Sequence, residues 1–428
     1  MLNFVKFSLW SRYLAIGTVL TMMLLLIACG SDDGEDRPGA VSVVNESGSV
    51  SGSVSGSVSG SVSGISGSAS GSASGSASGS ASGSASGSAS GSASGSASGS
   101  ASGTHAHSDS GSGSFEAMGA YTPVSNVESH ANLSLDVAEI NGLLGEKPIN
   151  WAAVKELYEN GKNSKKSSGN RTLAGYARNE GRSEAIWDDY TAFYGDQTWL
   201  DTFVMSAIDG TDAFAGTSDA VRKQGAQKGI QNQIMISYTI HELVAAMAKA
   251  EDKNFDPASG APHNWDEGWA FYHGVDPKNS PYGTAEKRGG NFGTGTAVND
   301  AIAVAMTEGV EALVNKDAAG AQVALDEIVK QVQITYVQAT IRYGSKVTSD
   351  LAKNDTEAAR VHQAEGWAFF RVIEPMAAAV NASAASEIAS LYDLTGSLDP
   401  EAGAKIKSAI EKIYPSWGIS SNEIGELQ

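Results

Sequence analysis

The sequence predicts an all-α protein, an internally duplicated helical bundle that follows a long unstructured segment. Apolar residues recur at spacings of three and four through most of residues 120–428, and strand patterns with hairpin turns are missing there. The pentapeptide Glu-Gly-Trp-Ala-Phe occurs twice, at residues 267–271 and 365–369. A repeated motif within a helical pattern indicates that one helical unit has been duplicated.

Predicted helices follow one another through the folded part. Helical periodicity is present at residues 133–144, 151–160, 199–214, 219–249, 299–314, 319–346, 356–378, 387–394 and 400–413. Connections rich in Gly, Asn and Pro are predicted at residues 254–264 and 276–295, because these residue types favour turns over regular elements.

A shift of 98 residues, set by Glu267 and Glu365, tests the duplication. The same shift aligns Tyr238 with Tyr336 and needs no gap between residues 230 and 277. Each unit is therefore predicted to contain an acidic helix, a long tyrosine-bearing helix and a motif helix. The units span about residues 199–277 and 298–375, and we expect them to pack about a pseudo-two-fold axis. Further helices at the N- and C-terminal ends would complete the bundle.

Residues 1–28 are typical of a bacterial lipoprotein signal peptide. Positive residues precede an apolar stretch at residues 13–27, and Leu-Ile-Ala-Cys at residues 26–29 matches a lipobox. Cys29 is the only cysteine, so it can carry a lipid but cannot form a disulfide within the chain. The alternative is an uncleaved membrane anchor, for which the stretch is shorter than the ~20 residues that span a bilayer.

We therefore expect the mature chain to be held in the cell envelope through Cys29. The Gly-Ser-Asp sequence after Cys29 favours the outer membrane over the inner one, with the folded part facing the periplasm or the cell surface. Residues 29–119 are predicted to be a tether. Residues 47–103 repeat Ser-Gly-Ser-Val and Ser-Gly-Ser-Ala units, which cannot bury enough apolar surface to fold. Such a coil spans on the order of 50 Å.

The charge balance excludes one class of partner. The formal net charge is −19, and the chain has no run of basic residues. Nucleic acid would repel such a chain, so we expect no nucleic-acid partner. An acidic surface is compatible with cation binding, although solubility explains the charge equally well.

Glu267 and Glu365 are the first candidates for metal ligands. A carboxylate inside an apolar helix is seldom left unpaired when it is buried. His263 lies four residues before Glu267 and His362 three before Glu365, so each imidazole shares a helix face with a carboxylate. Mixed nitrogen and oxygen ligation suits iron or zinc. The alternative is structural, with glutamates that hydrogen-bond neighbouring helices and histidines that belong to the core.

Asp209 and Glu308 are secondary candidates. They occupy nearly equivalent positions in the acidic helices of the two units. Inward carboxylates on duplicated helices are a known way to build metal sites in bundles. If the pseudo-two-fold axis brings Glu267 and Glu365 together, Asp209 and Glu308 would flank them.

Two features occur in only one unit. His241, beside Glu242, has no histidine counterpart in the second unit and is a further candidate ligand; the alternative is a helical histidine beside a surface glutamate. Residues 287–291, Lys-Arg-Gly-Gly-Asn, are predicted to form a basic loop that holds an anion such as carbonate or a carboxylate. The loop lacks the Lys-Ser/Thr ending of a nucleotide-binding loop.

No catalytic motif is present. The chain lacks His-Glu-x-x-His, Gly-x-Ser-x-Gly and paired cysteines, so we expect no enzymatic activity. A metal-dependent oxidase with a paired carboxylate site is a third alternative.

Several segments resemble known families. His362-Gln-Ala-Glu365 resembles the His-x-x-Glu element of bacterial imelysin-type iron-uptake proteins. Four longer segments resemble the Fe-assimilating, low-iron-inducible periplasmic proteins of green algae and their bacterial relatives, a likeness that covers about residues 125–418. They are Trp-Ala-Ala-Val-Lys-Glu-Leu-Tyr-Glu-Asn-Gly-Lys-Asn-Ser at 151–164, Gly-Ile-Gln-Asn-Gln at 229–233, Ala-Pro-His-Asn-Trp-Asp-Glu-Gly-Trp-Ala-Phe-Tyr-His-Gly at 261–274 and His-Gln-Ala-Glu-Gly-Trp-Ala-Phe-Phe-Arg-Val-Ile-Glu-Pro at 362–375.

This resemblance implies an extracytoplasmic protein that binds Fe2+ or Fe3+, and it selects iron over other divalent metals. We therefore predict a lipid-anchored protein that captures iron and passes it to an iron transporter. The alternative is a tethered surface module that binds a polysaccharide or a protein without metal, with exposed tryptophans as its anchors.

Overall fold

The computed structural model describes residues 115–178, 182 and 184–428, together with the backbone of seven two-residue strands between residues 50 and 90. The predicted signal peptide and the lipidation site Cys29 lie outside the described residues. Residues 35–113 form one compact unit, and Ser114–Gln428 belongs to another. Within the described residues, no helix combines the length and the apolarity needed to cross a membrane.

Short parallel pairings are the regular structure described within residues 35–113. The strands pair in the orders β1-β3-β6, β2-β5 and β4-β7. Their bounds are β1 (Val50–Ser51), β2 (Val58–Ser59), β3 (Ala69–Ser70), β4 (Ala73–Ser74), β5 (Ala77–Ser78), β6 (Ala85–Ser86) and β7 (Ala89–Ser90). A flexible tether stays a prediction for this segment.

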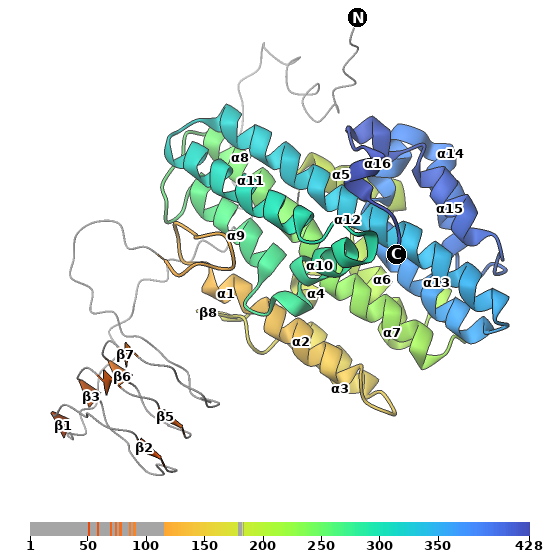
Figure 1. Cartoon of the computed structure of the whole chain (residues 1–428), viewed down its shortest axis with the longest axis horizontal. Helices are drawn as coiled ribbons and strands as arrows, with labels where there is room; N and C mark the ends of the chain where they lie inside the picture. The colour runs from red at the N-terminus through yellow and green to blue at the C-terminus, as the bar shows by residue number, and fades with distance from the viewer. Residues whose placement is uncertain are drawn as a thin grey trace, which may run out of the picture. The chain divides into compact units, whose positions relative to one another are not determined.

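The described residues from 115 onward form an all-α bundle, as predicted (Figure 1). A single two-stranded pairing, β8 (Lys165–Lys166) with β9 (Gly169–Asn170), interrupts the helices. The α-helices are α1 (Glu128–Ala131), α2 (Leu133–Leu143), α3 (Trp151–Asn160), α4 (Leu173–Ala177), α5 (Ala185–Tyr194), α6 (Trp199–Asp209), α7 (Asp219–Lys228), α8 (Met235–Glu251), α9 (Ala261–His273), α10 (Pro281–Phe292), α11 (Ala297–Val314), α12 (Ala318–Ala352), α13 (Thr356–Phe370), α14 (Glu374–Tyr392), α15 (Ala402–Ile410) and α16 (Ser421–Ile424). The shorter helical turns are η1 (Asp212–Phe214), η2 (Gly229–Ile234), η3 (Pro277–Asn279) and η4 (Tyr414–Trp417).

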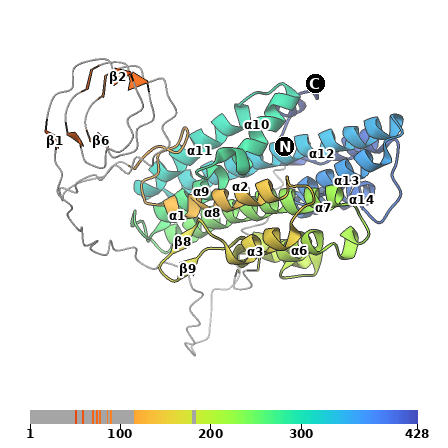
Figure 2. The same cartoon turned by 90° about the horizontal axis from the view of Figure 1, so that it is seen from below.

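The long helix α12 is the axis of this bundle. It has 35 residues and is therefore about 50 Å long. Helices α8, α10, α11, α13 and α15 all pack against it, and both views show it running across the bundle (Figures 1 and 2). Every residue from Gln331 to Ile341 is buried. A helix that is buried on all sides must lie inside the fold rather than on its surface.

The two motif helices, α9 and α13, are placed in similar surroundings. Helix α9 packs along α8, and α13 packs along α12. Each also contacts an element of the other predicted unit, α9 with α11 and α13 with α7. This exchange of contacts is compatible with the predicted pseudo-two-fold arrangement, and the duplication itself stays a prediction.

Helices α9 and α11 approach closely at a glycine. The fully buried Trp265 of α9 donates its indole N–H to the carbonyl oxygen of Met306 at 2.9 Å. A Cβ atom at Gly309 of α11 would lie 1.9 Å from the Trp265 ring. The indole therefore occupies the space that any side chain at Gly309 would need.

Three differences between the structure and the predicted elements bear on the candidate sites. The helix predicted at residues 219–249 contains a π-helical segment, η2, and the helix predicted at 356–378 breaks between α13 and α14. The connection predicted at residues 276–295 is wrong, because it contains α10, and the basic residues 287–291 are helical rather than a loop. The glycines of α10 lower its helix propensity, so its periodicity was not recognised in the sequence. The helix forms because Ala285, Arg288 and Phe292 pack in the interior on one face.

Substitution of Gly309 by Ala should destabilise the protein. Because the new Cβ would force Trp265 out of its position, we expect a loss of about 1–3 kcal/mol in the free energy of unfolding, measured by urea denaturation followed by circular dichroism. Gly290→Ala is the matched control, since a Cβ at Gly290 of α10 meets nothing within 4 Å. That variant should be neutral or more stable by about 0.4–1 kcal/mol. Equal stability of the two variants would contradict this account of the helix contact.

Candidate functional site

Two histidines converge on the buried glutamate of the first motif. In α9, His263 Nε2 lies 3.2 Å from Glu267 Oε1, one helical turn away as predicted. His130 of α1 brings its Nδ1 to within 3.2 Å of the same oxygen. All three side chains are largely buried, with between 10% and 18% of each exposed. The carboxylate of Glu267 is therefore the centre of a cluster built from two separate helices.

A second buried carboxyl group, Glu242 of α8, completes this cluster. It shares a hydrogen bond with Glu267, and Asn264 Nδ2 donates to both, at 2.6 Å to Glu242 Oε2 and 3.2 Å to Glu267 Oε2. Burial, and then the negative charge of Glu267, raise the pKa of Glu242 well above its usual range. Glu242 is thus the protonated partner, and the two carboxyl groups share one proton.

Glu267 keeps its negative charge in spite of its burial. Burial alone would raise its pKa, but the adjacent His130 and His263 outweigh this effect and hold the pKa of Glu267 below its usual range. For His263, burial lowers the pKa, whereas the hydrogen bond and charge of Glu267 raise it more strongly, so that the net shift is upward. The arrangement therefore favours an imidazolium at His263 beside a carboxylate at Glu267. We refer to Glu267, Glu242, His263 and His130 as the Glu267 cluster.

The N-terminal segment of the described chain orients His263. Ser125 Oγ lies 2.9 Å from His263 Nδ1 and donates to Asp266 Oδ2 at 2.6 Å. Asp266 also accepts from the Tyr121 hydroxyl and from the Val124 amide, the latter at 3.0 Å. Since the Ser125 hydroxyl is used as a donor to Asp266, it accepts from His263. Partners of this kind fix the ring orientation of a histidine in many metal sites.

Aromatic rings enclose one side of the Glu267 cluster. The Phe271 ring lies 5.9 Å from that of His130, 5.1 Å from Tyr176 and 5.3 Å from Tyr238. These rings keep water away and lower the local dielectric constant, which strengthens the interactions among the charged groups.

His241 lies beyond Tyr238 and has a different partner. Its Nδ1 lies 3.0 Å from Glu184 Oε1, and Glu184 also pairs with Arg182. Burial would raise the pKa of Glu184, but His241 and Arg182 lower it to about 2. His241 is therefore a partner in this ion pair network and is not in the Glu267 cluster.

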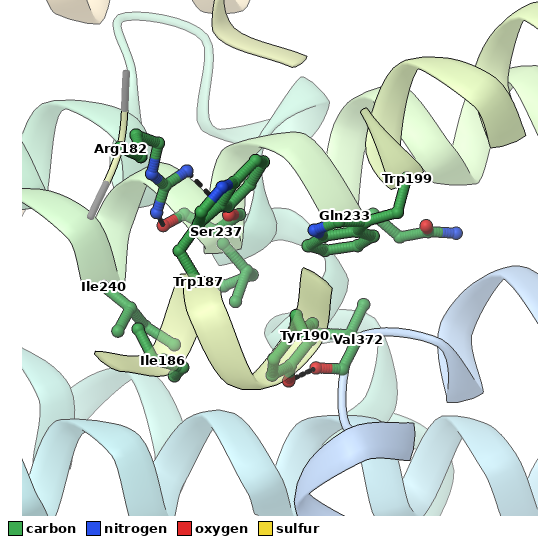
Figure 3. A pocket seen from close by; sticks show the side chains of 10 residues that line it. Arg182, Ile186, Trp187, Tyr190, Trp199, Gln233, Ser237, Ile240 and Val372 are labelled. Carbon is green, nitrogen blue, oxygen red and sulfur yellow. Dashed lines mark hydrogen bonds between the residues drawn. The ribbon is translucent and has the colours of Figure 1, made fainter. Parts of the chain in front are cut away.

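A small pocket, with a cavity volume of about 20 Å³, lies on another face of α8. Its walls are mainly aromatic and aliphatic, and Figure 3 shows Arg182 reaching Ser237 and the Tyr190 hydroxyl donating to the carbonyl oxygen of Val372. None of the predicted metal ligands lines it. The residues that line it are Arg182, Ile186, Trp187, Tyr190, Trp199, Gln233, Ile236, Ser237, Ile240 and Val372.

The glutamate of the second motif has different surroundings. Glu365 Oε1 accepts from the Tyr343 hydroxyl at 2.7 Å and lies 3.3 Å from Lys228 Nζ. His362 contacts Asp350 of α12, with 2.5 Å between Nδ1 and Oδ2. The charge of Glu365 is thus neutralised by a lysine, whereas the charge of Glu267 is balanced by two histidines.

The remaining predicted ligands lie on the surface. Asp209, the last residue of α6, is exposed and forms an ion pair with Lys155 at 3.0 Å. Glu308 is exposed on α11. Neither side chain is among the partners of the two buried motif glutamates.

The structure therefore distributes the seven predicted ligands over several places. Only Glu267 and His263 are brought together, and Glu267 and Glu365 have no partner in common. Among residues 115–178, 182 and 184–428, no three His, Cys, Asp or Glu side chains are already arranged to hold a metal ion. The predicted ligand set as a whole stays a prediction, but a single centre shared by both glutamates is not what the described residues show.

Sequence reasoning missed two members of the Glu267 cluster, His130 and Glu242. The structural alternative for His241 placed a surface glutamate at Glu242, but Glu242 is buried and His241 is the more exposed of the two. The sequence did mark Glu242 as unusual, because the equivalent position of the second unit, 98 residues later, holds Thr340 and no carboxylate. His130 lies 137 positions before Glu267 in the sequence, and no local spacing connects the two.

The fold and the cluster together define an all-α protein with a buried carboxylate–imidazole centre. The chain belongs to the low iron-inducible periplasmic protein (Fea1) family, whose model matches residues 92–428. This match confirms the family resemblance and supports an iron-related role outside the cytoplasm. No curated protein and no solved structure shows significant similarity to the chain.

The protonated state of Glu242 predicts a pH dependence of stability. Because folding raises the pKa of Glu242, its contribution is fully present below about pH 4.5 and is lost as the pH rises through the folded-state value. Glu242→Gln keeps a neutral hydrogen-bonding group, so its melting temperature should fall less than that of the wild type between pH 5 and pH 8. The exposed Glu311→Gln is the control and should follow the wild type. Parallel curves for all three proteins would contradict the assignment.

Proposed function

We propose that this chain is an extracytoplasmic iron-binding protein whose iron site is the Glu267 cluster. The observation that supports this most directly is the convergence of two imidazoles and two carboxyl groups on one buried point, from α1, α8 and α9. Two imidazole nitrogens with carboxylate oxygens are a donor set typical of non-haem iron. The family name, which links low iron to the periplasm, favours iron over other metals.

Protons now occupy the positions between these donors. Glu242 and Glu267 share a proton, and His263 donates to Glu267. A metal ligand must be deprotonated, so a bound cation would replace these protons and the hydrogen bonds within the cluster would open. The donor set therefore fits iron in its chemistry, although the side chains must rearrange to bind it. Bound iron would be cargo here, and the proposal assigns no catalytic step to the protein.

The second motif is less suited to a metal. The ammonium of Lys228 has no lone pair when protonated, and it lies against the oxygen of Glu365 that a cation would need. His362 is engaged with Asp350. We therefore assign Glu365 and His362 structural roles, in contrast to Glu267 and His263.

The alternative of a tethered module with tryptophan anchors loses its main support. Trp265 and Trp269 are fully buried, and Trp367 packs against the rings of Phe203 and Phe214. None of the described tryptophans is among the exposed residues. Anchoring through Cys29 in the outer membrane, and transfer of iron to a transporter, belong to the same proposal as the iron site.

Metal titration separates the two motifs. Purified protein should bind Fe(II) stoichiometrically under anaerobic conditions, as counted by elemental analysis after desalting. His263→Gln and Glu267→Gln should each weaken binding at least about 10-fold, because each removes a ligand and even loss of a residue that only orients a ligand costs about 10- to 100-fold. His362→Gln is the matched control and should bind as the wild type does. Loss of binding in His362→Gln but not in His263→Gln would place the site at the second motif instead.

The affinity for iron should rise with pH. Because the pKa values of His263 and Glu242 are both raised in the folded protein, binding must displace protons, and acidification opposes it. We expect weaker Fe(II) binding at pH 5.5 than at pH 7.5, with proton release detectable by calorimetry in buffers of different ionisation enthalpy. Binding that is independent of pH and buffer would exclude displacement of these protons.

A further inference from the structure

A second buried charged cluster surrounds the glutamate of the second motif. It consists of Lys228, the last residue of α7, Arg288 of α10, Tyr343 of α12 and Glu365 of α13. Arg288 is only 6% exposed, and Glu365 is 9% exposed. We call these four residues the Arg288 cluster. The iron proposal makes no use of it.

The guanidinium of Arg288 has donors without acceptors. Its Nε and Nη1 atoms are buried and have no hydrogen-bond partner among the described residues. Its Cζ atom lies 5.4 Å from the centre of the Tyr343 ring and 5.8 Å from that of Phe369. Lys228 Nζ lies 5.9 Å from the centre of the same Phe369 ring. Two cations therefore lie close to one aromatic ring, and one of them offers unused N–H groups.

The cluster has an excess of positive charge. Lys228 and Arg288 carry two positive charges, and Glu365 supplies one negative charge. Tyr343 is neutral, because burial and then Glu365 raise its pKa to about 12 against the opposing effect of Arg288, which also hydrogen-bonds to its hydroxyl. The neighbouring Asp350 is already paired with His362 and Lys353.

A positive excess in which Arg288 is buried and only 19% of the Lys228 side chain is exposed is unexpected in a chain with a net charge of −19. Buried charges in proteins are normally paired. Burial has the largest effect and lowers the pKa of Lys228, Glu365 raises it, and the nearby Lys287 and Arg288 lower it again, so that the net shift is downward. A bound anion beside Lys228 would favour its charged form. Arg342, whose Cζ atom lies 5.2 Å from the Tyr343 ring, is partly exposed to solvent and is therefore left out of this charge count. One negative charge is therefore missing from the described side chains.

We propose that the Arg288 cluster binds a small, singly charged oxyanion, either a carboxylate or bicarbonate. Guanidinium N–H groups are well matched to the oxygens of such anions, and Lys228 supplies a second cationic donor. One negative charge balances the two cations and Glu365, which favours a monoanion over a dianion.

The helix geometry adds to this assignment. Lys228 immediately precedes η2, the π-helical segment. π-Helical turns are rare and occur frequently at functional sites. This inference is independent of the iron site, because the Arg288 cluster and the Glu267 cluster have no residue in common.

Thermal unfolding of the full chain, freed of metal, tests the proposal. Sodium acetate, bicarbonate, phosphate and sulfate are titrated against sodium chloride at constant ionic strength. We expect acetate or bicarbonate to raise the melting temperature saturably beyond the effect of chloride, with one site per chain by calorimetry. Saturation by acetate identifies a carboxylate site, and saturation by bicarbonate alone identifies a carbonate-type ligand. Tighter binding of sulfate than of either monoanion would contradict the charge balance.

Two variants locate the anion. Arg288→Gln should weaken binding at least tenfold, while Lys287→Gln, which removes the same charge from an exposed neighbour, should bind as the wild type does. Lys228→Gln is a second variant in the cluster, for use if Arg288→Gln does not fold. Fe(II) binding should be unchanged in the folded variants, so that failure of this proposal and failure of the iron proposal are distinguishable. Unchanged anion binding in Arg288→Gln, or no binding beyond chloride in the wild type, would overturn the proposal.

Discussion

Burial of a carboxylate at Glu267 is the constraint on which the candidate site depends. An isolated buried charge is costly, so Glu267 needs partners on every side. His130, His263, Asn264 and Glu242 supply them from three helices. The same interactions therefore join α1 and α8 to α9 and concentrate metal-type donors at one point. Cohesion of this part of the bundle and the proposed capture of iron have a common physical origin.

The two motifs solve the same electrostatic problem differently. Glu267 is balanced by imidazoles and by a shared proton, all of which a metal can replace. Glu365 is balanced by Lys228 and by the Tyr343 hydroxyl, which leave no ready place for a cation. The two identical pentapeptides therefore lie in different sites: the one at Glu267 can accept a cation and the one at Glu365 cannot. The difference arises because the partners of each glutamate come from outside the motif.

The helical framework was largely predictable from the sequence, and the partners across helices were not. Periodicity located α3 at its observed bounds and α11 within two residues, because these helices carry local patterns of burial. The spacing of His263 and Glu267 followed from the helix repeat. Lys228 could not be connected to Glu365 in this way, because their contact depends on how α7 packs against α13. Glycines concealed α10, and with it the burial of Arg288.

The hydrogen bonds of Asp266 have a mechanical consequence. Residues 121–125 hold Asp266 through one hydroxyl from Tyr121, one from Ser125 and one backbone amide, and Ser125 also holds His263. Displacement of this segment would break these bonds together and free the His263 ring to rotate away from Glu267. Residues 121–125 therefore hold His263 in position. A pulling force on this segment would weaken the binding of an ion in the Glu267 cluster.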